Sequence, residues 1–196
     1  MKKIIALIAL VAMFAVNSAN AGVPITKVDK VAPTDEIFMD MAVTAAKKAV
    51  KEGQAPCGAV IILNGAWRST GIPGASATAE ENAISKSRRQ TMSNSTLYTI
   101  VEPTTEVYNT ICKLGADAIY FVVGRDEAVA KGIYPASAYD DSKVDSSVPA
   151  VPMSQLPYAD AETLVKNYNK KYYCCHSTHP RRDVLTCSGA DCRLNC

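Results

Sequence analysis

TAEENAISKSRRQTMSNSTLYTIVEPTTEV, residues 78–107, decides the fold of this chain. Thr78 is a good N-cap for a helix, which we expect over residues 79–92. Residues 96–101 (TLYTIV) are mostly β-branched or aromatic, which predicts a buried strand. Pro103 suits the first turn of a further helix over 104–114. A helix between two strands requires a parallel return, so this segment predicts part of a layered α/β sheet.

The residues before this segment predict a helix and a hairpin. Apolar residues recur at helical spacing over 34–53, where Gly53 ends the pattern. The continuous apolar run at 55–63 is typical of a buried strand. Asn64-Gly65 is a strong signal for a two-residue hairpin turn into a second strand over 66–70.

The residues after the segment complete the predicted domain. We expect a strand over 118–123, a short helix near 126–130 and a final amphipathic helix over 159–171. The alternation of helices and strands predicts a single α/β domain over residues 22–171.

The first 21 residues resemble a secretory signal peptide. Lys2 and Lys3 precede an apolar run over 4–16, and Ala19-Asn20-Ala21 offers small residues for cleavage. The apolar run is too short to span a bilayer, and we expect no membrane association after cleavage. The sequence therefore predicts a periplasmic or secreted protein that starts near Gly22.

The charge balance argues against nucleic acid as a partner. Without Lys2 and Lys3, 19 Lys and Arg face 19 Asp and Glu. Proteins bind nucleic acid largely by neutralising its phosphates with Lys and Arg. A net charge of zero therefore gives no sign of a nucleic-acid-binding surface.

Residues 172–196 form a Cys-rich tail. In an oxidising compartment its cysteines predict disulfide bonds, although His176 and His179 leave a metal site as the alternative. Cys57 and Cys112 are either buried thiols or partners of the tail. The disulfide candidates are Cys174, Cys175, Cys187, Cys192 and Cys196.

Four motifs in order resemble the cytidine deaminase-like superfamily, closest to its bacterial guanine deaminase and tRNA adenosine deaminase branch. Residues 56–61 (PCGAVI) resemble its P-F-G-A-V-I strand, and 78–80 (TAE) lie where it has H-A-E. Residues 96–99 (TLYT) and 102–103 (EP) resemble its T-L-Y-T strand and the start of its cysteine loop. The resemblance implies a three-layer α/β/α sandwich with a mixed sheet of about five strands.

The departures from the family fall on its zinc ligands. The family binds zinc through the His of H-x-E and both Cys of P-C-x-x-C, and its Glu moves protons. Here Glu80 and Pro103 remain, but the ligand positions hold Thr78, Thr104 and Val107. Threonine hydroxyls are poor zinc ligands and valine is none, so we expect no metal and no other cofactor.

The resemblance implies that Thr78, Glu80, Pro103, Thr104 and Val107 surround a pocket where the zinc site was. Our main hypothesis is an inactive, exported deaminase-fold protein that binds a small purine-like ligand or a protein partner, with a homodimer as a further option. The alternative is a hydrolase with altered, zinc-independent chemistry, in which Glu80 is the general base. The structural alternative is that both threonines are N-caps and that Glu80 favours a helix start.

Overall fold

The structure, a computed structural model, describes residues 23 and 25–168. The predicted signal peptide at 1–21 and the tail at 172–196, with its five cysteines, lie outside the described residues. Within the described part, no helix is both long and apolar enough to cross a membrane.

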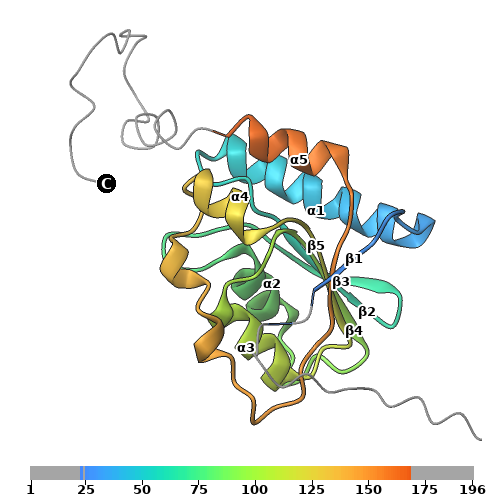
Figure 1. The fold of residues 1–196 in the computed structure, drawn as a ribbon. Helices are drawn as coiled ribbons and strands as arrows, with labels where there is room; N and C mark the ends of the chain where they lie inside the picture. The colour runs from blue at the N-terminus through green and yellow to red at the C-terminus, as the bar shows by residue number, and fades with distance from the viewer. Residues whose placement is uncertain (1–22, 24, 169–196) are drawn as a thin grey trace, which may run out of the picture.

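Six strands in the described part form one sheet (Figure 1): β1 (Ile25–Lys27), β2 (Ala59–Leu63), β3 (Ala66–Gly71), β4 (Ser95–Val101), β5 (Ala118–Val123) and β6 (Met153–Gln155). The helices are α1 (Pro33–Lys51), α2 (Ala79–Ser87), α3 (Thr105–Leu114), α4 (Arg125–Ala130) and α5 (Ala159–Lys166), with 3-10 turns η1 (Ala136–Ala138) and η2 (Asp141–Lys143).

The sheet is mixed, with the order β1-β6-β5-β4-β2-β3. β1, β6, β5 and β4 are parallel neighbours, while β2 is antiparallel to both β4 and β3. Asn64 and Gly65 form the turn of the β2–β3 hairpin, both with positive φ, as a two-residue turn requires. The hairpin prediction is therefore confirmed.

Helices cover both faces of the sheet, and neighbouring residues of β4 show this directly. The Tyr98 hydroxyl donates to Asp35 of α1 at 2.6 Å, while the Thr99 hydroxyl donates to Glu80 of α2. Successive strand side chains point to opposite faces, so α1 and α2 lie in different layers. In Figure 1, α5 lies beside α1, and α3 lies beside α2. The predicted α/β fold with flanking helices is confirmed.

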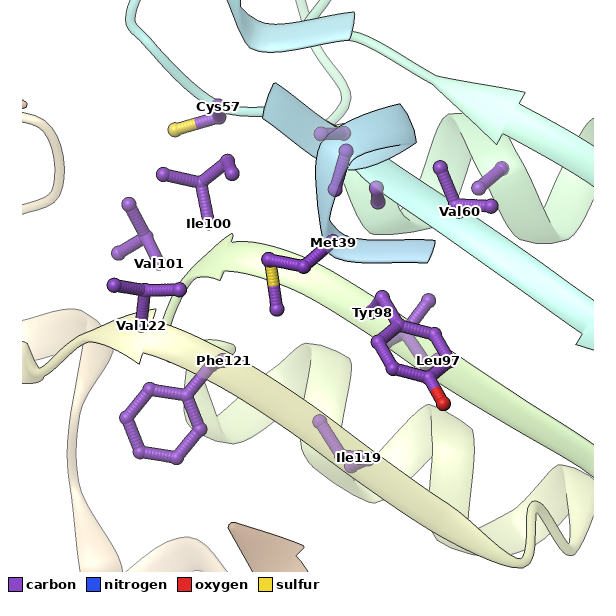
Figure 2. Packing of buried hydrophobic residues seen from close by; sticks show 14 of the residues in the cluster. Met39, Cys57, Val60, Leu97, Tyr98, Ile100, Val101, Ile119, Phe121 and Val122 are labelled. Carbon is purple, nitrogen blue, oxygen red and sulfur yellow. The ribbon is translucent and has the colours of Figure 1, made fainter. Parts of the chain in front are cut away.

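Two glycines allow the helices to approach the sheet closely. A Cβ added to Gly58 would lie 2.3 Å from the Ala42 carbonyl oxygen of α1. A Cβ added to Gly71 would lie 1.9 Å from the Ala79 carbonyl oxygen of α2. The core fills the same space: Figure 2 shows Met39 of α1 among side chains of β4 and β5.

The sheet has one strand more than the roughly five that we expected, because β1 lies in the lead-in that we expected to be irregular. β1 has only three residues, and its burial falls from partial at Ile25 to exposed at Lys27. It pairs with β6 alone, through the backbone. Hydrophobic periodicity cannot reveal such a short edge strand.

Three predicted boundaries were also wrong. β2 begins at Ala59, four residues later than expected, because residues 55–58 approach α2 and α3 as a loop. α2 ends at Ser87 and not at 92, since Arg88 takes a left-handed conformation. α5 ends at Lys166, where Asn167 is its C-cap.

Candidate functional site

Thr78 caps the start of α2 in a reciprocal arrangement. Its side-chain oxygen accepts from the Glu81 backbone N–H at 3.2 Å, and the Glu81 carboxylate accepts from the Thr78 N–H at 2.7 Å. This capping box satisfies two backbone donors that a helix start would otherwise leave unpaired. The position at which the resembled family has its zinc-binding His is therefore a helix cap in this chain.

Thr104 has the same role at the start of α3. Its side-chain oxygen accepts from the Val107 backbone N–H at 3.5 Å. Val107 is only 2% exposed and offers an apolar side chain where the family has a cysteine. Pro103, just before the cap, is buried.

A cavity of about 550 Å³ lies between these two helix starts. Its lining residues come from four segments: 54–57, 73–81, 104–107 and 133–134. Thr78, Thr104 and Val107 are among them, so three of the five predicted pocket residues share one cavity. Glu80 and Pro103 do not line it.

Glu80 is buried beside this cavity rather than at the solvent side of α2. One carboxyl oxygen accepts from the Thr99 hydroxyl, and the other, Oε2, has no hydrogen-bond partner among the described residues. Burial raises the pKa of Glu80, and the charge of Glu81 adds to this, while the hydroxyls of Thr99 and Thr78 oppose it. Glu80 is thus a buried acid with unused hydrogen-bonding capacity.

The structure adds Cys57 and Tyr134 to the site, which the sequence analysis did not assign to it. Both line the cavity. Burial raises the pKa of the Cys57 thiol well above its usual range, and the Glu80 carboxylate adds to this. Burial raises the pKa of the Tyr134 hydroxyl as well, and its neighbours Cys57 and Glu80 add to this.

Cys57 has a signal in the sequence, since it replaces the Phe of the resembled P-F-G-A-V-I motif. Tyr134 has none that periodicity could detect, because it lies in a loop between α4 and η1. It is brought to the cavity by the chain's return over α2 and α3. Such placement depends on contacts between residues that are distant in the sequence.

Glu102, the acid of the E-P motif that precedes Pro103, anchors the loop that carries Tyr134. It is almost fully buried, and both of its carboxylate oxygens are bonded to Arg125: Oε2 accepts from the backbone N–H at 2.9 Å and Oε1 from the guanidinium at 2.6 and 2.7 Å. Arg125 also binds Asp141 at 2.8 Å. The Tyr139 hydroxyl donates to the Glu102 carbonyl at 3.0 Å. These bonds tie residues 125–141 to the end of β4.

The residues of this cavity do not fit zinc. Structural and catalytic zinc sites need three or four thiolate, imidazole or carboxylate ligands. Here Thr78 and Thr104 use their side-chain oxygens as helix caps, and Val107 has no donor atom. Across residues 23 and 25–168, no group of three His, Cys, Asp or Glu side chains could hold a metal ion.

Comparison with solved structures gives the same fold. A tRNA:A34 deaminase is 20% identical with a TM-score of 0.51, over 66% of this chain and 99% of that chain. The guanine deaminase from Nitrosomonas europaea is 17% identical with a TM-score of 0.55, over 71% and 85%. A protein in complex with 2,6-diaminopurine is 16% identical with a TM-score of 0.56, over 78% and 87%. At these identities the likeness shows the fold alone.

Comparison of the sequence with protein families finds a similar region in the first part of the domain. No curated protein matches the chain. Residues 32–123, from the start of α1 to the end of β5, match the family described as the cytidine and deoxycytidylate deaminase zinc-binding region. The matched region contains both helix starts that line the cavity. Residues 32–123, a little under half of the chain, are therefore similar to this deaminase family's zinc-binding region.

Proposed function

We propose that this protein is a binding protein built on a deaminase fold, which holds a small purine-like ligand in the cavity between α2 and α3 and does not carry out zinc-dependent deamination. The observation that carries this proposal is the cavity itself. It lies at the two helix starts where the family binds its metal, but Thr78, Thr104 and Val107 replace the ligands.

The proposed loss of deamination follows from the chemistry of water. Zinc lowers the pKa of bound water toward neutrality, so that hydroxide is present to attack a ring carbon. The three residues at the ligand positions cannot hold zinc. Glu80 would then have no metal-bound water from which to remove a proton.

The proposed ligand class rests on the size and lining of the cavity. A volume of about 550 Å³ lies within the usual range of small-molecule sites. Val107, Ile133 and Tyr134 give an apolar wall suited to a flat ring, and Gln54 and Thr78 bring polar atoms. Similar folds that include a guanine deaminase and a complex with 2,6-diaminopurine make purines the first ligands to test.

A zinc-independent hydrolase is the second candidate, and one observation favours it. Glu80 is fully buried with a raised pKa and an unpartnered oxygen, as is common for carboxylates that move protons in catalysis. In this alternative Glu80 would remove a proton from an attacking water.

One set of assays separates the two candidates. Ammonia release is measured from guanine, adenine, cytosine and their nucleosides, and thermal shift is measured with the same compounds. We expect stabilisation by a purine without ammonia release. Activity that is lost in Glu80→Gln would falsify the binding-protein proposal, whereas activity that this variant retains would point to a contaminant. If no compound stabilises the protein, the protein-partner alternative takes precedence.

We also propose that the protein works in the periplasm or outside the cell. Lys2, Lys3 and the apolar run at 4–16 support export. Expression of the full chain and N-terminal sequencing of the exported form should give a start near Gly22. Replacing Leu7 and Leu10 with arginine should retain the protein in the cytoplasm, and unchanged export would contradict the proposal.

A further inference from the structure

A basic surface lies where the C-terminal end of α2 meets the edge strand β3, at the end of α2 opposite to the cavity. Hydrogen bonds join the two elements there. The Arg68 guanidinium donates to the Ser87 carbonyl oxygen at 2.7 and 3.1 Å, and Lys86 donates to the Thr70 carbonyl oxygen at 3.3 Å. Four exposed cations gather at this place: Arg68, Lys86, Arg88 and Arg89.

Neighbouring acids do not neutralise these four cations. Residues 53–79 and 82–101, which contain all four, have no Asp or Glu. Across residues 23 and 25–168, none of the four forms a salt bridge. Asp117 contacts the second segment only at the backbone N–H of Asn94, at 3.1 Å. The side-chain bonds that the cations do make go to backbone carbonyl oxygens, so the surface keeps its full positive charge.

The tryptophan of β3 lies beside these cations. Trp67 is 58% exposed, and its indole N–H donates to the Thr70 hydroxyl at 2.9 Å. The carbonyl oxygen of the same Thr70 accepts from Lys86, which places the ring next to the basic side chains. An indole has an apolar body and one polar N–H, and such rings are enriched where a membrane meets water.

The geometry of β3 argues against an added strand as the partner of this surface. Ile61 pairs with Ser69 and Ile62 with Trp67, so Arg68 is the extra residue of a β-bulge. A bulge in an edge strand interrupts the row of backbone donors and acceptors that another strand would need. A flat anionic surface needs no such row, because its phosphates are met by cationic side chains.

We propose that Trp67 and the four cations, together called the basic edge, dock the protein on the surface of an anionic phospholipid bilayer. Lys and Arg side chains are attracted to such a surface and can extend along it, while the tryptophan ring enters the headgroup region. This departs from the expectation of no membrane association, which considered only segments that span the bilayer. Contact at a surface needs no such segment.

The fluorescence of Trp67 tests the proposal directly, because the chain has only one tryptophan. Residues 22–196 are used, since they keep every described residue and omit the apolar run at 4–16, which can bind bilayers by itself. We expect vesicles of phosphatidylglycerol and phosphatidylcholine to shift the emission to shorter wavelength, and vesicles of phosphatidylcholine alone to leave it unchanged. Salt at about 0.5 M should abolish the shift, because it screens surface charges.

Paired charge variants locate the contact. Arg88→Gln with Arg89→Gln should weaken binding to the anionic vesicles about 25-fold, at about fivefold for each cation near the surface. Lys27→Gln with Lys30→Gln is the matched control, because it removes the same charge from exposed residues at the opposite edge of the sheet, in and just after β1. The control should bind as the parent does.

A second pair of variants tests the ring. Trp67 and Ile37 are both exposed large apolar residues, at 58% and 61%, but Ile37 lies in α1 between Asp35, Glu36 and Asp40. In sedimentation with anionic vesicles, Trp67→Ala should lose binding several-fold and Ile37→Ala should lose none. Thermal melting of each variant shows that it folds.

The outcomes decide between a bilayer and other anionic partners. Equal shifts with neutral and anionic vesicles, or equal binding by the two charge variants, overturn the proposal. Single-stranded DNA that changes the Trp67 emission at phosphate concentrations where anionic vesicles do not would also overturn it, and would assign the basic edge to nucleic acid. None of these results bears on ligand binding in the cavity, which is tested with purines and without vesicles.

Discussion

Glu80 shows how burial changes the role of a residue that a motif alone would assign to catalysis. In the family motif this position moves protons beside a metal. Here the carboxyl is buried, bonded to Thr99 on one oxygen and without a hydrogen-bond partner on the other in the described part of the chain. The alternative explanation as a helix-start acid is also incomplete, since the side chain is enclosed and not exposed at the end of the helix.

The first prediction concerns the pH dependence of stability at Glu80. The pKa of this acid is raised above its ordinary value of 4.5 in the folded protein. The folded state then binds the proton more tightly than the unfolded state, so this group contributes less to stability as pH rises above about 4.5. Glu80→Gln should therefore gain free energy of unfolding relative to the parent with increasing pH, by at most about 1.4 kcal/mol per pH unit.

Urea denaturation between pH 4.5 and 8.5 measures this difference. Glu106→Gln is the control, because it removes an exposed carboxylate from the same cavity wall and leaves the buried Glu80 in place. Parallel stability curves for the Glu80→Gln variant and the parent would show that Glu80 is not a buried acid.

A second prediction restores the donor set at the cavity. The triple variant Thr78→His, Thr104→Cys and Val107→Cys recreates the family's ligand pattern at two helix starts that share one cavity. We expect one more zinc per chain than in the parent, measured by elemental analysis after dialysis. Subtracting the parent value removes zinc bound elsewhere. No additional zinc would mean that these positions do not converge.

At the scale of elements, the helix starts depend on contacts between residues that are close in the sequence. The capping box joins Thr78 and Glu81, and a single side-chain cap joins Thr104 to Val107. These contacts need only a few neighbouring residues. The helix ends are less local, as Arg88 stops α2 in a left-handed conformation that residues other than glycine seldom adopt.

The third prediction is that Thr78→Ala lowers the free energy of unfolding by about 1 kcal/mol, because the α2 start loses its cap. Chemical denaturation measures the loss. Thr44→Ala is the control, since Thr44 is exposed within α1 and alanine favours a helix. An equal loss in both variants would contradict the capping role.

The fourth prediction concerns the contact between β3 and α2. A Cβ at Gly71 would lie 1.9 Å from one α2 backbone atom and 2.5 Å from another, so Gly71→Ala must push the helix away. We expect destabilisation of about 3 kcal/mol or more. Gly74→Ala is the control, because its nearest neighbour is the end of the Asn82 side chain at 3.3 Å. A Gly71→Ala variant as stable as the control would show that α2 does not approach so closely.

At the scale of the whole molecule, one ionic network joins the sheet to the cavity wall. Glu102 directly follows β4, Arg125 begins α4, and Asp141 begins η2. The Arg125 guanidinium also lies over the Tyr139 ring, with its Cζ atom 5.5 Å from the ring centroid. The network thereby fixes the loop that brings Tyr134 to the cavity.

The fifth prediction is that Arg125→Met destabilises the protein by about 3–5 kcal/mol, because it leaves Glu102 as a buried charge without its partner. The double variant Arg125→Met with Glu102→Gln should recover part of the loss, since the uncompensated charge is gone. Denaturation curves of both variants and of Glu102→Gln alone complete the cycle. If Arg125→Met and the double variant are equally stable, the unpaired charge of Glu102 is not the cause of the destabilisation.

The sequence by itself determined the elements that depend on neighbouring residues. The spacing of apolar residues predicted α1, Asn64-Gly65 predicted the hairpin, and Thr78 and Thr104 indicated the two helix starts. The ordered motifs also indicated the family, since they preserve the order of its strands and helices even where its ligands are lost. These signals are short in range, so a single sequence is enough to read them.

Only the tertiary structure decided what surrounds the cavity. β1 exists because β6 offers a backbone partner, although its three residues carry no periodic signal. Cys57 and Tyr134 come close enough to Glu80 for its charge to raise the pKa of each, because segments far apart in the chain fold onto the same helix starts. One side-chain oxygen each of Gln54 and Glu80 is closed off from water by packing and has no hydrogen-bond partner among residues 23 and 25–168. Burial and long-range contact are properties of the packed molecule, and no local pattern encodes them.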